Sequence, residues 1–104
     1  MGKKFPEIKR LLKALKNKFD VEEAIVFGSR VGEDYLETSD IDLILVSKDF
    51  EDIPFVERMS KICEFWNGKI SLEALCYTPK EFEKKKKQIG IVREAVKTGL
   101  VVAG

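Results

Sequence analysis

Residues 24–46 of this chain read AIVFGSRVGEDYLETSDIDLILV, and the fold can be built outward from this stretch. Its first four residues are an apolar run typical of a buried strand, and the run stops at Gly28-Ser29. A second run, residues 40–46, begins with Asp40-Ile41-Asp42 and is apolar enough for a strand buried on both faces. We expect a short helix over residues 29–35 between them. The stretch therefore predicts a strand, a tight turn, a helix and a second strand.

The Gly28-Ser29 step predicts a phosphate-binding turn. Backbone N–H groups at a helix N-terminus are free to bind an anion. The Ser29 hydroxyl can cap the helix and also donate to a phosphate, and Arg30 in the first helical turn would add a positive charge. The plainer interpretation is an ordinary strand-to-helix turn followed by a surface arginine.

Asp40 and Asp42 predict a metal site. They lie two residues apart at the start of a strand, so both side chains share one face, where their charges repel. A divalent cation would neutralise them, and Mg²⁺ prefers oxygen ligands of this kind together with substrate phosphates. The alternative is two solvated acids; we favour the metal site because a strand, a Gly-Ser turn and a helix precede them. A phosphate-binding turn beside paired carboxylates indicates metal-dependent phosphoryl or nucleotidyl transfer.

Glu73 is an acid within an otherwise apolar segment, residues 70–77, which we expect to form the third strand. An unpaired carboxylate is costly in such a strand. If this strand lies beside the second, Glu73 faces the same cleft as Asp40 and Asp42, and three acids would hold two metal ions. If the strand is a half-exposed edge, Glu73 points to solvent. The spacing leaves both interpretations open.

The composition indicates one globular domain over residues 1–104, with a net charge of +1. The chain has no histidine, which excludes a Ser-His-Asp triad, a histidine-based zinc site and an imidazole base. The near-zero net charge argues against nucleic-acid binding. Cys63 and Cys76 lack metal-ligand spacing, and we expect two buried thiols in a reducing cytoplasm. No signal peptide or membrane span is recognised, which also favours a cytoplasmic location.

The remaining elements follow from helical periodicity and capping signals. An amphipathic helix is expected over residues 6–18, and another begins near residues 52–54. Thr78-Pro79 with Glu81 is a strong helix start, because threonine caps, proline takes the first position and an acid takes the third. With a final helix over residues 91–97, helices alternate with strands. The fold class is therefore α/β (α+β), a small mixed β-sheet covered by helices.

Residues 55–65 carry an apolar stripe at helical spacing, which we assign to core packing rather than to the binding of a cofactor. Its spacing is that of a helix face turned toward a core. Trp66, just beyond it, is either core or a partner contact. The stripe consists of Phe55, Met59, Ile62 and Phe65.

Two further segments bear on what the surface of the protein does: the basic run at residues 84–87 and the apolar tail at residues 100–103. The lysines are expected to form a solvated helix end, because no aromatic residues interleave with them. The tail is expected to form an edge strand or a subunit contact. Because sheet edges need covering, we expect a homodimer or an obligate hetero-complex.

Three motifs carry a family resemblance: FGSR at residues 27–30, SDIDL at 39–43 and YTPKEF at 77–82. Together with the chain ending, they resemble the minimal nucleotidyltransferases of the DNA polymerase β superfamily, and the resemblance covers nearly the whole chain. It implies a nucleotidyltransferase fold, two Mg²⁺ ions and ATP or another nucleoside triphosphate as donor. Some small members, the MntA-like antitoxins, pair with an HEPN-type helical partner and transfer AMP to it.

The resemblance also implies roles for individual residues. Asp40 and Asp42 would be metal ligands, and Gly28 and Ser29 would bind the triphosphate. Glu73 falls where the family carries its third carboxylate, which is commonly Asp.

The leading hypothesis is therefore a Mg²⁺-dependent enzyme that transfers a nucleoside monophosphate to a hydroxyl group on a protein partner. The first candidate for the transferred group is AMP, with ATP as its donor. Asp40 and Asp42 would hold the metal, while Glu73 would complete the second metal site or accept the hydroxyl proton. Arg30 would assist Gly28 and Ser29 with the triphosphate. The rival hypothesis is a non-catalytic or weakly active nucleotide-binding protein that acts by binding an HEPN-type partner.

Overall fold

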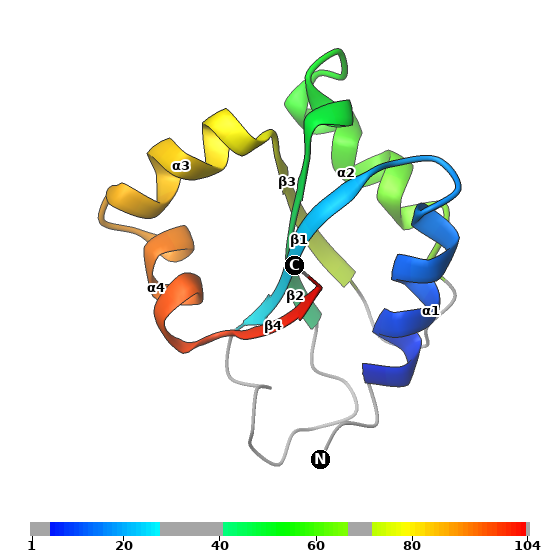
Figure 1. Cartoon of the computed structure of the whole chain (residues 1–104), viewed down its shortest axis with the longest axis horizontal. Coiled ribbons are helices and arrows are strands. Elements are labelled where there is room, and N and C mark those ends of the chain that lie inside the picture. The colour runs from blue at the N-terminus through cyan, green and yellow to red at the C-terminus, as the bar shows by residue number, and fades with distance from the viewer. Residues whose placement is uncertain (1–4, 28–40, 67–71, 104) are drawn as a thin grey trace.

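The computed structural model describes residues 5–27, 41–66 and 72–103 as helices and strands around one central sheet (Figure 1). The helix predicted over residues 29–35 lies outside the described residues. None of the described helices is long and apolar enough to cross a membrane. In chain order the elements are α1 (Phe5–Leu15), β1 (Val21–Phe27), β2 (Ile41–Ser47), the short 3-10 helix η1 (Lys48–Phe50), α2 (Phe55–Cys63), β3 (Leu72–Tyr77), α3 (Pro79–Lys87), α4 (Ile91–Thr98) and β4 (Leu100–Ala103).

The described strands form a four-stranded sheet in the order β3-β2-β1-β4. β1 is antiparallel to both β2 and β4, whereas β2 and β3 run parallel and are connected through α2. This confirms the predicted mixed sheet. It also confirms that the tail at residues 100–103 forms an edge strand.

Each face of the sheet is covered by two helices, so that the molecule has three layers (Figure 1). Alternate residues of β2 serve the two faces: Leu43 and Leu45 belong to the core under α1 and α2, while Ile44 and Val46 belong to the core under α3 and α4. The apolar residues of β2 are buried, as expected for a strand covered on both sides. The predicted helical face of α1 is buried as well and comprises Ile8, Leu11, Leu12 and Leu15.

The start of α3 matches its capping signal closely. The Thr78 hydroxyl accepts a hydrogen bond from the Glu81 N–H at 3.2 Å, and the Glu81 carboxylate accepts one from the Thr78 N–H at 2.9 Å. Two otherwise unpaired N–H groups are thereby satisfied, which fixes the direction in which the chain leaves β3.

The end of α4 packs tightly against β1 at Gly99. A Cβ at this position would lie 2.5 Å from the Ala95 carbonyl oxygen and 2.9 Å from the Val26 carbonyl oxygen. The missing side chain therefore permits the close approach that leads the chain from α4 directly into β4.

The boundaries of several elements differ from the prediction. β1 begins at Val21, three residues earlier than its apolar run, because the strand extends through two glutamates. α1 ends at Leu15 and is followed by a turn. Pro54 is the N-cap of α2 rather than its first helical residue.

Candidate functional site

A row of paired residues crosses the sheet at the end where β1 stops and β2 and β3 begin. Phe27 pairs with Asp42, and Asp42 pairs with Glu73 across the parallel β2–β3 ladder. Because adjacent strands lie about 4.8 Å apart, the main chains of Asp42 and Glu73 are direct neighbours. The sheet thus brings together two acids that the sequence singled out.

Asp42 and Glu73 both lie on the sheet face that α3 and α4 cover. Each acid stands between two residues of the α1–α2 core, and side chains alternate along a strand, so each acid belongs to the opposite face. Asp42 is half-buried and Glu73 is exposed. Each interpretation of Glu73 was therefore partly right: β3 is an edge of the described sheet, and Glu73 reaches solvent on the same face as Asp42. The role of Glu73 as a metal ligand stays a prediction.

The other predicted site residues lie outside the described residues. They are Gly28, Ser29, Arg30 and Asp40. In sequence, the first three directly follow Phe27 and the last directly precedes Ile41. Both segments thus connect to strand ends that belong to the row.

The chemistry of the two neighbouring carboxylates fits a hard divalent cation. Like charges on directly neighbouring strands destabilise each other, and a cation such as Mg²⁺ would offset this repulsion with oxygen ligands that it prefers. Within residues 5–27, 41–66 and 72–103, no group of three or more histidine, cysteine or acidic side chains is placed to hold a metal ion. The third predicted ligand, Asp40, falls outside these ranges.

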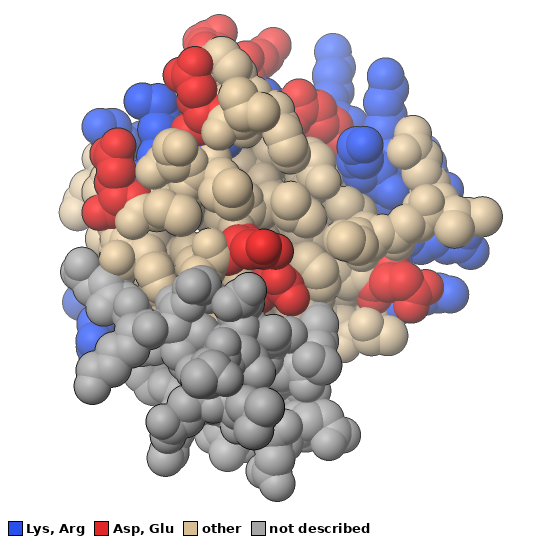
Figure 2. All heavy atoms as spheres, turned by 180° about the vertical axis from the view of Figure 1, so that it is seen from behind, with Lys and Arg blue, Asp and Glu red and all other residues tan. Residues whose placement is uncertain are grey.

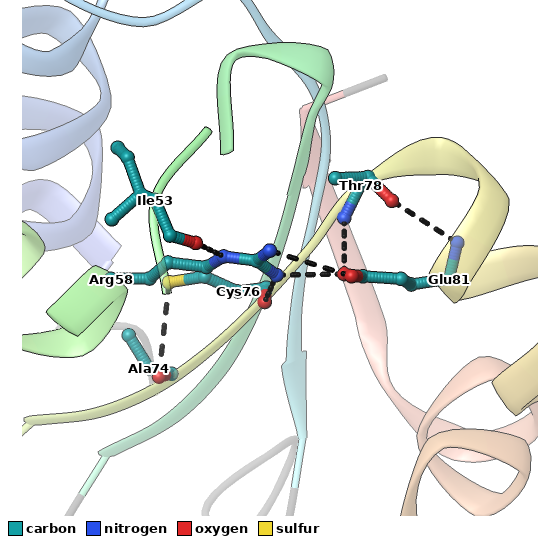
Figure 3. Close-up of polar contacts among 6 residues, drawn as sticks. All are labelled: Ile53, Arg58, Ala74, Cys76, Thr78 and Glu81. Atoms are coloured by element: carbon teal, nitrogen blue, oxygen red, sulfur yellow. Dashed lines mark hydrogen bonds and ion pairs between the residues drawn. The ribbon is translucent and has the colours of Figure 1, made fainter. Parts of the chain in front are cut away.

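Arg58, which the sequence analysis missed, organises the opposite end of β3 (Figure 3). Its guanidinium group is buried, donates to the carbonyl oxygens of Ile53 at 2.8 Å and Cys76 at 3.0 Å, and pairs with the Glu81 carboxylate at 2.7 Å. Arg58 thereby joins α2 to β3 and to the first turn of α3. An arginine one turn before Ile62, within an apolar helical stripe, was the signal that could have identified it.

The Arg58 network changes the acidity of two neighbouring groups. The hydrogen bond from Arg58 is the main cause that lowers the pKa of Glu81. Burial raises the pKa of the Cys76 thiol to about 12, and the nearby Arg58 charge only partly counteracts it. Glu81 is therefore held as a carboxylate and Cys76 as a neutral thiol.

The orientation of α2 corrects one prediction. Phe55 and Met59 were expected in the core, but they are 48% and 42% exposed. The helix is turned so that Arg58 and Ile62, one turn apart, face inward, because the Arg58 guanidinium finds carbonyl and carboxylate partners there. Phe65 and Trp66, beyond the helix, are partly buried and pack against the core, and a partner contact by the exposed part of Trp66 stays a prediction.

The prediction for the two cysteines was partly wrong, whereas the prediction for the basic run at residues 84–87 was confirmed. Both cysteines are free thiols, but only Cys76 is buried; Cys63 is exposed, so the prediction of two buried thiols was wrong for Cys63. Cys63 lies at the last position of α2, where the helix surface turns toward solvent. The run at residues 84–87 forms the last turn of α3 and is mostly exposed, as expected for a solvated helix end.

Comparison with known proteins identifies relatives of this architecture. The family model of the nucleotidyltransferase domain matches residues 8–98. The fold is similar to the crystal structure, at 1.40 Å resolution, of a candidate nucleotidyltransferase from Sulfolobus solfataricus, with a TM-score of 0.58 and 29% sequence identity. That match covers 76% of this chain and 70% of the other. A search of curated proteins gives no match.

Proposed function

Because the chain belongs to the nucleotidyltransferase domain family and is therefore a transferase, we propose that it transfers a nucleoside monophosphate to a hydroxyl group, with AMP from ATP as the first candidate. The observation that carries this proposal is the pairing of Asp42 with Glu73 on one face of the sheet. A core packing role would not require two neighbouring carboxylates at the end of a largely apolar strand pair. Carboxylates of this kind would instead hold a divalent cation, which in turn binds the phosphates of a nucleotide.

In the proposed site, one set of residues would bind the metal ions and another set would bind the phosphates. Asp42, Glu73 and Asp40 would hold two Mg²⁺ ions. When bound, such ions stabilise negative charge on phosphate oxygens and increase the acidity of an attacking hydroxyl. Glu73, as the exposed acid of the pair, is the best placed of the two to accept the hydroxyl proton. Gly28, Ser29 and Arg30 would bind the triphosphate and the departing pyrophosphate, since they follow the β1 end of the row.

We place the acceptor hydroxyl on a partner protein. A net charge of +1 supports this choice, because domains that bind nucleic acids usually carry a larger excess of positive charge. The resemblance to small antitoxins suggests an HEPN-type helical partner in a toxin–antitoxin pair. Two free thiols are compatible with a cytoplasmic setting. The competing proposal is a binding protein whose nucleotide site is vestigial or regulatory.

Labelled-nucleotide transfer tests the proposal. The protein, with a co-purified partner, is incubated with Mg²⁺ and ATP labelled at the α-phosphate, and labelled protein is measured. We expect labelling by the wild type and its loss in Asp42→Asn and Asp40→Ala, with partner binding unchanged. Glu22→Gln is the matched control, because Glu22 is an exposed acid at the opposite end of β1. If wild type and Asp42→Asn label nothing but bind the partner equally, the binding protein replaces the enzyme.

A further inference from the structure

A groove of about 610 Å³ lies on the same side of the sheet as the acid pair. Its floor includes Leu75 and Tyr77 of β3, and Leu75 is two residues beyond Glu73 on the same face. At about 3.3 Å per residue, the floor begins roughly 7 Å from Glu73. The walls come from the start of α2, one face of α3, the α3–α4 connection and the start of α4, and include Phe55, Glu81, Lys85, Ile89 and Ile91.

The rim of the groove is apolar and exposed. Ile89 is 90% exposed and Ile91 is 61% exposed, and both line the groove together with the half-exposed Phe55. In Figure 2 a small group of acidic side chains stands in the middle of a largely uncharged surface, and both acidic and basic side chains lie toward its edge. Clustered apolar side chains of this kind are typical of a surface that another molecule covers.

The charge is positive where α3 borders the groove, away from the acid pair. Lys85 lines it, and neither Lys84, Lys85 nor Lys87 forms an ion pair with any described residue, whereas Lys86 is paired with Glu83. The acid on the groove wall, Glu81, is already neutralised by Arg58 at 2.7 Å. An occupant that carries carboxylates beside its apolar groups would therefore complement this surface.

The groove is preformed by the Arg58 network. The Arg58 guanidinium lies 5.7 Å from the ring centre of Phe55, and the rings of Phe55 and Tyr77 are 5.6 Å apart. The ion pair of Arg58 with Glu81 fixes the adjoining face of α3. A wall held in this way loses little conformational freedom when a ligand binds.

We propose that this groove docks an acidic amphipathic helical segment of a partner protein, with its apolar face on Ile89, Ile91 and Phe55 and its carboxylates beside Lys85. Resting on the proposed function, the docked segment presents its acceptor hydroxyl to Asp42 and Glu73. The groove thus selects the protein that receives the nucleotide.

Two fluorescent peptides test the docking surface without nucleotide or metal. One carries leucines at i, i+3, i+4 and i+7 with glutamates between them, and the other carries lysines in place of the glutamates. Fluorescence anisotropy should show binding of the glutamate peptide at least about tenfold tighter than that of the lysine peptide. Lys85→Glu should reverse this preference, and Ile89→Ser should weaken both peptides.

The controls separate this proposal from the catalytic one. Lys13→Glu changes an exposed lysine of α1 on the other side of the sheet and should bind like the wild type. Asp42→Asn should also bind like the wild type, so a failure of the proposed transfer reaction would leave the docking result intact. Equal affinity for both peptides, no binding of either, or an unchanged preference in Lys85→Glu would overturn the proposal. Self-association that Ile89→Ser abolishes would instead assign the groove to a second copy of the chain and would also overturn it.

Discussion

Asp42 and Glu73 are register partners in neighbouring parallel strands, and their side chains share one face of the sheet. Two carboxylates in this arrangement repel each other, and added positive charge would reduce that repulsion. A cation that lies between the two strand ends would convert this repulsion into coordination. The stability of the protein should therefore report directly on metal and nucleotide binding.

The first prediction concerns the combined effect of metal and nucleotide on melting temperature. We expect Mg²⁺ or Mn²⁺ together with ATP to raise the melting temperature by more than the sum of the shifts that the metal and ATP each cause alone, because metal and phosphates complete each other's coordination. Asp42→Asn should abolish this synergy, and Glu73→Gln should reduce it. Differential scanning fluorimetry with Glu22→Gln as control measures it. Equal shifts in wild type and Asp42→Asn would remove Asp42 from the metal site.

How much of this arrangement the sequence predicts depends on whether it is local. The Thr78 cap, the end of α3 at Lys87 and the two-sided burial of β2 follow from neighbouring residues and were predicted correctly. The position of Glu73 was not decided, because β2 and β3 are separated by α2 in the sequence, and the sequence of neither strand alone shows that they pair or which residues face each other.

The rotation of α2 could not be predicted for a related reason. Helical periodicity locates an apolar stripe but not a charged residue that is buried because of distant partners. Arg58 is buried because Glu81, in another helix, and the Cys76 carbonyl, in a strand, accept its hydrogen bonds. The cost of burying its charge is offset only in the assembled fold, so the stripe alone predicted Phe55 in its place.

The second prediction concerns Gly99. A Cβ at this position would lie 2.7 Å from the Ile25 side chain as well as close to two backbone oxygens, and backbone cannot move aside cheaply. We expect Gly99→Ala to lower the free energy of unfolding by about 1–3 kcal/mol, as overpacking typically does. Urea denaturation measures this, with Lys97→Ala on the exposed side of α4 as control. Unchanged stability in Gly99→Ala would contradict the close packing of α4 on β1.

The third prediction concerns the two thiols. Cys63 is exposed, whereas Cys76 is buried with a pKa raised to about 12 by desolvation, so it has almost no thiolate at neutral pH. We expect a maleimide to label one cysteine of the native protein, and both after denaturation in urea. Peptide mass spectrometry should locate the native label on Cys63. Labelling of Cys76 at a similar rate in the Cys63→Ser variant would contradict the packing of β3 beneath Arg58.

The last prediction concerns the ion pair between Arg58 and Glu81. Glu81→Gln leaves the buried guanidinium without its anionic partner, which should cost about 1–3 kcal/mol. The lower part of this range applies, because the Glu81 side chain is 44% exposed and solvent screens the pair. Since the pKa of Glu81 is lowered in the folded protein, its contribution is fully present above its ordinary value of 4.5 and is lost as the pH falls through the folded pKa. Urea denaturation of wild type and Glu81→Gln should therefore show the largest difference in stability near neutral pH and a shrinking one below pH 4.5.

Glu83→Gln is the control, because Glu83 pairs with Lys86 on the surface and such pairs contribute little. A stability difference that stays constant with pH, or one that Glu83→Gln matches, would show that Arg58 does not depend on the Glu81 charge.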